Sequence, residues 1–301
     1  MSIIKTIDKI LYFVIPLLFS ACGGQATQSL DDTYTYTDDY GSVVEIPLHP
    51  HRIVSTSPAV TEIIFALGGS GQLVGRTDFC VYPPEATKIE SIGGISNLNI
   101  ERIVSLNPDL VISGSMIPKK STIQMEKMGV PTVCVIEQQH YEGLYDNIRK
   151  IGSLIGRSKA ADSLNNLLRD RLKRLDVQTT AKPKSVYYVV GFGASGNFTA
   201  GGDSFINDII RLAGGHNIAE DISGWSYSLE KLMQQNPEYI IIRKEDSAAF
   251  CRMAPYNQLQ AVKSGQVIAI ESSIIDLQVP RNTEAIQFLF DRLHQQKDSS
   301  Q

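Results

Sequence analysis

The sequence has few of the residues that most often carry metal or redox chemistry. Its 301 residues include four cysteines, five histidines and one tryptophan, and no two cysteines have the C-x-x-C spacing. A metal site needs three or four converging ligands, but only two of the histidines are close together in the chain. The histidines are His49, His51, His140, His216 and His294. We therefore expect no metal site, no cofactor and no catalytic residue.

Positive charge is also scarce. Lysine and arginine number 28 against 32 aspartates and glutamates, which gives a net charge of −4, and no basic run occurs. Proteins that bind nucleic acid through phosphate contacts carry clustered lysine and arginine. This composition excludes nucleic acid as a principal partner.

The N-terminus has no apolar run of the length that a membrane-spanning helix needs, which is about 20 residues. Its apolar run covers only residues 10–19, follows Lys5 and Lys9, and precedes Cys22. This pattern is typical of a signal peptide over residues 1–21 and is similar to a bacterial lipobox. The similarity implies cleavage before Cys22 and acylation of that residue, with residues 22–45 as a polar tether. An ordinary secretory cleavage site and an uncleaved anchor are the alternatives.

Lipidation of Cys22 leaves Cys80, Cys134 and Cys251, an odd number for an oxidising compartment. At most one pair can form among them, and the sequence does not say which. Cys134 lies within the strand-like segment 132–137, where a buried cysteine acts as a small apolar side chain. We expect no cysteine chemistry beyond the anchor.

Strand-like and helical segments alternate along the mature chain, which predicts an α/β fold. Expected strands cover 52–56, 72–77, 109–114, 132–137, 185–190, 238–243 and 266–270; expected helices cover 58–67, 100–107, about 119–128, two within 141–177, and then 204–212, 229–235, about 256–263 and 282–295. We divide the chain into an N-terminal lobe (46–154), a connecting helix (155–180) and a C-terminal lobe (181–301).

The two halves resemble each other in sequence. Residues 99–113 align with 228–242, and residues 57–69 align with 203–215, in the same order. The alignment matches Glu62 with Asp208. Two such blocks indicate a duplicated lobe, and two lobes that face each other create a cleft for a ligand.

A G-x-G-x-x-G motif follows an expected strand at residues 191–196. In a dinucleotide site such a motif opens a helix whose amides bind the pyrophosphate. Here no helix can begin before about Ser204, because the intervening residues favour a loop. Ser195 lies in this motif but lacks the G-x-S-x-G pattern of a nucleophile. The motif therefore does not predict a dinucleotide-binding enzyme.

The loops expected at the cleft are rich in serine, glycine and aromatic residues, which suits a large, flat, partly apolar ligand. Trp225, the only tryptophan, lies in such a loop, where its ring can stack on a ligand or be buried as part of the core. Glu101 and Glu230 occupy matched places in the first turn of a helix in each half. They stabilise the helix dipole or meet basic residues on a symmetric partner.

Three segments resemble the periplasmic binding proteins of the cobalamin, haem and iron-siderophore importers, and the resemblance is strongest to the cobalamin branch. They are residues 52–69, 75–94 and 99–114. The resemblance implies two similar α/β lobes joined by a long rigid helix, with the ligand cleft between them. It also implies two positions, Ile95 and Gly114, at which the cobalamin protein has tryptophan.

The resemblance further implies functional residues by position. Ligand contacts fall at Ser57, Pro58, Phe79, Tyr82, Phe198, Trp225 and Arg281, and transporter-docking residues fall at Glu101 and Glu230. A haem would need an axial ligand such as Tyr82 or Tyr227, whereas a corrinoid arrives with its cobalt already coordinated.

The expected function is that of a substrate-binding subunit of an ABC importer. We expect a monomer anchored by lipid on the periplasmic side of a bacterial membrane, which captures cobalamin or a related corrinoid. It would deliver this ligand to a dimeric permease with its ATPase subunits. A haem or ferric-siderophore binding protein is the alternative within the class, and a dinucleotide-binding enzyme is the alternative outside it.

Overall fold

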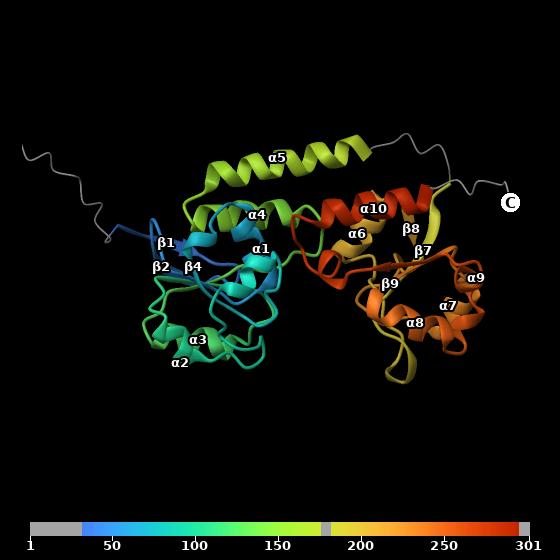
Figure 1. Ribbon diagram of the computed structural model, residues 1–301, viewed down its shortest axis with the longest axis horizontal. Coiled ribbons are helices and arrows are strands. Elements are labelled where there is room, and N and C mark those ends of the chain that lie inside the picture. The colour runs from blue at the N-terminus through green and yellow to red at the C-terminus, as the bar shows by residue number, and fades with distance from the viewer. Residues whose placement is uncertain (1–31, 176–181, 295–301) are drawn as a thin grey trace, which may run out of the picture. The chain divides into compact units, whose positions relative to one another are not determined.

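A computed structural model of the chain describes residues 32–175 and 182–294. The expected signal peptide, Cys22 and the first part of the expected tether lie outside the described residues. Residues 32–301 belong to one unit. Within this unit the chain forms two lobes connected by a long helix (Figure 1).

Each lobe is built on a four-stranded parallel sheet, and the two sheets have the same strand order. The N-terminal sheet has the order β4-β3-β5-β6, and the C-terminal sheet has the order β8-β7-β9-β10. The strands are β3 (Ile53–Ser55), β4 (Leu73–Arg76), β5 (Leu110–Ser113), β6 (Thr132–Cys134), β7 (Lys184–Val189), β8 (Gly215–Asn217), β9 (Tyr239–Arg243) and β10 (Val267–Ile270). Nearly continuous apolar runs such as residues 239–243 form these strands because helices cover parallel sheets on both faces.

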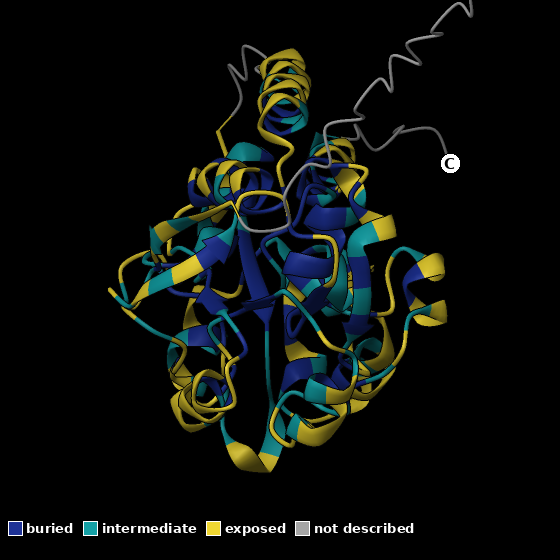
Figure 2. Cartoon of the chain, turned by 90° about the vertical axis from the view of Figure 1, so that its left-hand side faces the viewer, coloured by how far each residue is buried: buried dark blue, intermediate teal, exposed yellow. Residues whose placement is uncertain are grey.

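Helices surround both sheets, and their exposed residues lie on the outer faces (Figure 2). The N-terminal lobe contains α1 (Pro58–Ala66), α2 (Ile100–Ser105), α3 (Lys119–Lys127) and α4 (Gly143–Leu154), with short 3₁₀ helices η1 (Ser70–Gln72) and η2 (Pro84–Lys88). The C-terminal lobe contains α6 (Phe205–Leu212), α7 (Leu229–Gln235), α8 (Lys244–Arg252), α9 (Gln260–Lys263) and α10 (Asn282–His294), with η3 (Gly193–Ser195), η4 (Tyr256–Gln258) and η5 (Ser272–Ile274).

The aligned blocks occupy equivalent elements of the two lobes. Asn99 caps α2 and Ser228 caps α7 through the same side-chain acceptance of a backbone N–H. Asn107 and Asn236, which end the two blocks' helices, both have positive φ, at 46° and 43°. Asparagine tolerates this left-handed conformation better than most residues. The matched residues and the shared strand order agree with the predicted duplication.

The connecting helix α5 (Ser158–Leu175) packs against α4 of the first lobe and α10 of the second (Figure 1). Its 18 residues correspond to about 27 Å, enough to extend along both lobes. It starts later than the expected residue 155, because Gly156 has a φ of +70° and separates it from α4. In the ranges that the structure describes, no helix combines the length and apolar character needed to cross a membrane.

Part of the expected tether is folded. Strands β1 (Thr33–Thr37) and β2 (Val43–Pro47) form an antiparallel hairpin within and just beyond residues 22–45. The side chain of Asp38 accepts hydrogen bonds from the backbone of Ser42 and of Cys134, which ties the hairpin turn to β6. Ile46 is fully buried in the core. The alternating sequence of residues 33–37 is typical of a strand, so the range expected for the tether extends too far. Strand β8 and helix α8 were also not predicted.

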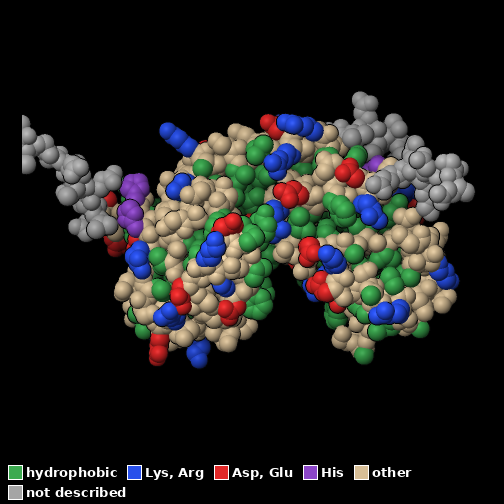
Figure 3. Space-filling model, viewed as in Figure 1, with side chains coloured by type: hydrophobic (Ala, Val, Ile, Leu, Met, Phe, Trp, Pro, Cys, Tyr) green, Lys and Arg blue, Asp and Glu red, His purple; other side chains and the backbone are tan. Residues whose placement is uncertain are grey.

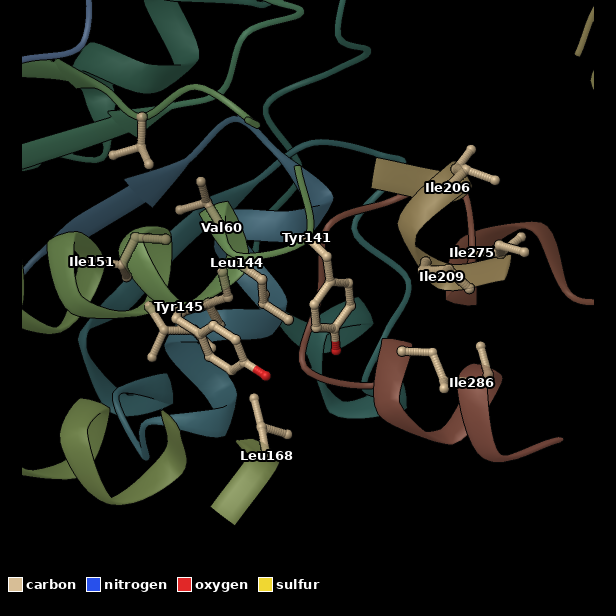
Figure 4. Close-up of a cluster of buried hydrophobic side chains, with 14 of the residues drawn as sticks. Val60, Tyr141, Leu144, Tyr145, Ile151, Leu168, Ile206, Ile209, Ile275 and Ile286 are labelled. Atoms are coloured by element: carbon tan, nitrogen blue, oxygen red, sulfur yellow. The ribbon is translucent and has the colours of Figure 1, made fainter. Parts of the chain in front are cut away.

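One hydrophobic core extends across both lobes. It includes Leu144 and Tyr145 on α4, Leu168 on α5, and isoleucines of α6 and α10. Figure 4 shows Tyr141 between the side chains of α4 and those of α6 and α10. The lobes therefore share buried apolar surface at the side where α5 lies.

Helix α5 offers a matched test of this shared core. Leu168 is 1% exposed, whereas its neighbour Leu167 is 46% exposed. We expect Leu168→Ala to lower the free energy of unfolding by about 2–5 kcal/mol, because the change leaves a cavity. Leu167→Ala changes it by about 0.5 kcal/mol or less. Urea unfolding measures both, and equal effects of the two substitutions would contradict the placement of α5.

Candidate ligand-binding cleft

A cavity of about 680 Å³ lies between the lobes. Its lining comes from loops at the carboxyl ends of strands of both sheets: Thr56, Ser57 and Pro58 after β3, Gly114 after β5, Glu137 after β6, Arg243 at the end of β9, and Ser272, Ser273, Asp276 and Leu277 after β10. Ligands of open α/β sheets bind at this edge. The hollow between the lobes is visible in Figure 3, and its volume suits a small molecule.

The N-terminal wall is apolar. Phe79, Val81 and Met116 line the cavity and are 60%, 57% and 69% exposed. Cys80 is buried between Phe79 and Val81, and its Sγ lies 3.2 Å from the hydroxyl oxygens of Thr61 and Thr77. The buried Cys80 fixes this turn, so its two neighbours face solvent. Exposed apolar side chains grouped in a hollow mark a binding surface.

The C-terminal wall is polar. The carboxylate of Asp276 accepts a hydrogen bond from the hydroxyl of Tyr188 and another, at 3.0 Å, from Nε of Arg243. Burial raises the pKa of Asp276, and the hydrogen bonds from Tyr188 and Arg243 oppose that rise. The Asp276–Arg243 ion pair is therefore a fixed part of the wall.

Several residues expected at the ligand do line the cavity. Ser57, Pro58 and Phe79 are among them, together with Ile95 and Gly114. A Cβ at Gly114 would lie 2.6 Å from Cβ of Ser57, so these two loops touch. A larger side chain at Gly114 requires the Ser57 loop to move.

Arg281, also expected to contact the ligand, is engaged elsewhere. Its Nε and Nη2 donate to the two carboxylate oxygens of Glu62 at 2.9 and 2.8 Å. The ring of Tyr82 covers the guanidinium at 3.5 Å. Arg281 and Tyr82 are absent from the described lining of the cavity. Glu62 uses two of the five N–H groups of Arg281, so direct ligand contact by Arg281 and Tyr82 stays a prediction.

This ion pair joins the lobes, because Glu62 lies on α1 and Arg281 precedes α10. An equivalent contact joins them in the reverse direction: Asp208 on α6 accepts a hydrogen bond of 2.9 Å from the backbone N–H of Tyr141, which precedes α4. Glu62 and Asp208 are the acidic residues matched by the duplication. Each acid on the first helix of one lobe thus holds the segment before the last helix of the other.

Gln278 adds a third connection between the lobes. Its fully buried amide donates to the carbonyls of Gln138 and His140 and accepts from the backbone N–H of Gln138 and the amide of Asn147. All of its donors and acceptors are used. A buried amide with every hydrogen bond satisfied fixes a single arrangement of the segments that it joins.

The comparison with known proteins is consistent with this geometry. A family described as periplasmic binding protein matches residues 53–274. The chain belongs to this family. The family is a class of binding proteins and not of enzymes.

Individual relatives are similar over most of their length. The chain is 29% identical over 297 residues to the Bacillus subtilis protein YvrC, named an uncharacterized ABC transporter substrate-binding lipoprotein, covering 92% of this chain and 93% of that one. A cobalamin-binding protein of Halobacterium salinarum is 27% identical over 277 residues, covering 86% and 74%. The solved apo structure of the periplasmic haem-binding protein RhuT from Roseiflexus matches with a TM-score of 0.74 at 26% identity, covering 81% and 98%. The two-lobed α/β class and the predicted family are thereby confirmed.

Phe198 and Trp225, two further expected contacts of this binding protein, lie side by side on the C-terminal lobe. The backbone of Phe198 bridges to Gly191 and to Ser226, next to Trp225. They are 36% and 48% exposed and are not among the described residues that line the cavity. Trp225 is therefore not a core residue, and its contact with a ligand stays a prediction.

The glycines of the motif at residues 191–196 leave room for the side chain of Phe198 and do not form a nucleotide site. A Cβ at Gly191 would lie 3.1 Å from Cδ2 of Phe198, and one at Gly196 would lie 3.4 Å from its ring. Helix α6 begins only at Phe205, with Ser204 as its cap. This confirms that the motif does not open a helix.

The remaining candidate residues are placed as follows. Glu101 and Glu230 are exposed in the first turns of α2 and α7, and neither has an ion-pair partner among the residues that the structure describes. Cys80, Cys134 and Cys251 are free thiols, which resolves the open question of their pairing. In residues 32–175 and 182–294, no group of three or more potential ligands could hold a metal ion.

Three charged residues of the cavity, Glu137, Arg243 and Asp276, were not predicted from the sequence. Glu137 follows β6, Arg243 is the last residue of β9, and Asp276 follows β10, so all three lie at the carboxyl-end edge of a sheet. The rule that ligands bind at this edge could have singled out Glu137 and Arg243. Asp276 lies six residues beyond β10, and its place depends on η5.

The Glu62–Arg281 pair provides a test of the connection between the lobes. The side chains are 5% and 13% exposed, so removal of one charge leaves the other buried and unpaired. We expect Glu62→Gln to lower the free energy of unfolding by about 3–5 kcal/mol. The double change Glu62→Gln with Arg281→Met recovers most of this loss, since no charge remains buried. Urea unfolding of the parent, the single variant and the double variant measures these differences in stability. A Glu62→Gln variant as stable as the parent would contradict the buried pair.

Proposed function

We propose that this protein is the substrate-binding subunit of an ABC importer and that it captures cobalamin or a related corrinoid. The observation that carries the proposal is the cavity between the lobes, with the exposed apolar side chains of Phe79, Val81 and Met116 on one wall. Such a wall suits the face of a large macrocycle. Relatives named cobalamin-binding protein support the same ligand class.

The tyrosines favour a corrinoid over haem. Haem iron needs an axial ligand from the protein, and Tyr82 and Tyr227 are the tyrosines expected in this role. The hydroxyl of Tyr227 donates to the carbonyl of Ile218 in the core of the C-terminal lobe, and burial raises its pKa. The ring of Tyr82 stacks on Arg281. Neither tyrosine contributes to the described cavity lining, whereas a corrinoid needs no ligand from it.

The N-terminus and one glutamate on each lobe are the features that would deliver the ligand to the permease. We propose that acylated Cys22 holds the protein at the periplasmic side of the membrane. There Glu101 and Glu230 present one negative charge on each lobe to basic residues of a dimeric permease. Complementary charges set orientation and encounter rate, and a two-fold partner suits a duplicated protein.

Ligand titration tests the cavity. We expect Phe79→Ala to weaken corrinoid binding by about tenfold or more, because an exposed aromatic anchor is lost. The matched control is Phe288→Ala on α10, which is 40% exposed and lies in a groove lined by residues of α5 and α10 rather than in the cavity. Quenching of the single tryptophan, Trp225, reports binding in both variants.

Two outcomes contradict the proposal. If Phe79→Ala and Phe288→Ala bind a corrinoid equally well, the ligand does not use this cavity. If the parent protein binds haem or a ferric siderophore but no corrinoid, the ligand class is wrong although the family assignment stands.

Uptake into vesicles tests the docking role. We expect Glu101→Ala or Glu230→Ala alone to reduce uptake by up to about fivefold, because an exposed ion pair contributes about 0.2–1 kcal/mol. The double change reduces uptake by about tenfold or more and leaves ligand affinity unchanged. Glu126→Ala with Glu245→Ala, which removes exposed charges from α3 and α8, is the control. Normal uptake by the Glu101 and Glu230 double variant would remove the docking role.

A further inference from the structure

The charged groups of the cavity are unequal in number. Its lining contains two carboxylates, Glu137 and Asp276, and one guanidinium, Arg243, so its formal charge is −1. Asp276 and Arg243 neutralise each other through their 3.0 Å contact. Glu137 has no cation within ion-pair distance among the described residues. The cavity therefore contains one uncompensated negative charge.

Glu137 is positioned to meet a ligand. One of its carboxylate oxygens, Oε2, accepts a hydrogen bond from the hydroxyl of Ser115, which fixes the side chain of Glu137. The other, Oε1, lies 3.7 Å from where a Cβ of Gly114 would be. The absence of that Cβ leaves room beside Oε1. A carboxylate in this position accepts hydrogen bonds and repels a second carboxylate.

The opposite wall supplies donors. Arginine has five N–H groups, and in Arg243 the Nε–H is bonded to Asp276. The side chain is 32% exposed, so its remaining N–H groups can meet a carbonyl oxygen of a ligand. Because Asp276 already balances its charge, Arg243 attracts a ligand carboxylate only weakly.

We propose that this cavity selects macrocyclic ligands whose side groups are amides over those whose side groups are carboxylates, with Glu137 as the discriminating residue. The proposal rests on the function proposed above and adds the chemistry by which the ligand is recognised. An amide N–H donates to Glu137, and an amide carbonyl accepts from Arg243. A carboxylate has no proton to donate to Glu137 and meets its negative charge, and unpaired or repelling groups are an effective means of rejecting a wrong ligand.

The test compares ligands that differ in a single group. Dicyanocobinamide is titrated beside the monocarboxylic acids made from it by hydrolysis of one amide. We expect the parent protein to bind the amide at least about tenfold more tightly than the acids, with a preference that declines in high salt. The isosteric change Glu137→Gln brings the affinities to within about threefold, whereas the control Glu126→Gln on α3, which makes the same change in net charge, keeps the preference.

Equal affinity of the parent protein for amide and acid would overturn the inference, and so would a preference that Glu137→Gln leaves intact. Failure to bind any corrinoid overturns the proposed ligand instead. In that case haem and its dimethyl ester, which differ in two carboxylate charges, test the selection separately. Preference for the ester that is lost in Glu137→Gln supports the discriminating role of Glu137, and preference for haem itself contradicts it.

Discussion

The buried ion pair between Glu62 and Arg281 is the contact on which the cleft depends. The two sheets share no hydrogen-bonded strands, so their separation is set by contacts between helices and loops. Glu62, its counterpart Asp208 and the saturated amide of Gln278 provide these contacts. Together with the shared core and α5, they hold the carboxyl ends of both sheets at the two sides of one cavity.

Duplication explains why the cleft can have two different walls. The equivalent strands β6 and β10 are both followed by residues of the cavity, Glu137 after β6 and Asp276 after β10. Strand β4 is followed by the exposed apolar residues Phe79 and Val81, whereas the loop after its equivalent β8 contributes nothing to the described lining. The frame is thus symmetric, whereas the binding surface is not. A planar ligand with an apolar face and a polar rim suits such a pair of walls.

Local signals in the sequence were sufficient for most of the fold. Apolar runs and helix caps predicted the alternation of strands and helices, and the paired Asn-Pro sites helped to predict the duplication. The β1–β2 hairpin was missed because residues 33–37 alternate threonine with tyrosine rather than with aliphatic residues. The ion pair between Arg281 and Glu62 was not predicted because the two residues lie 219 positions apart in the chain. Glu137, Arg243 and Asp276 come together only through the packing of the lobes, which no local pattern encodes.

In the proposed function, a corrinoid occupies the cavity between the two lobes. X-ray diffraction at the cobalt absorption edge, from crystals grown with dicyanocobinamide, tests it most directly. We expect an anomalous peak between the wall that contains Phe79 and the wall that contains Arg243. A peak outside this cavity, or no peak from coloured crystals that contain the corrinoid, would contradict it.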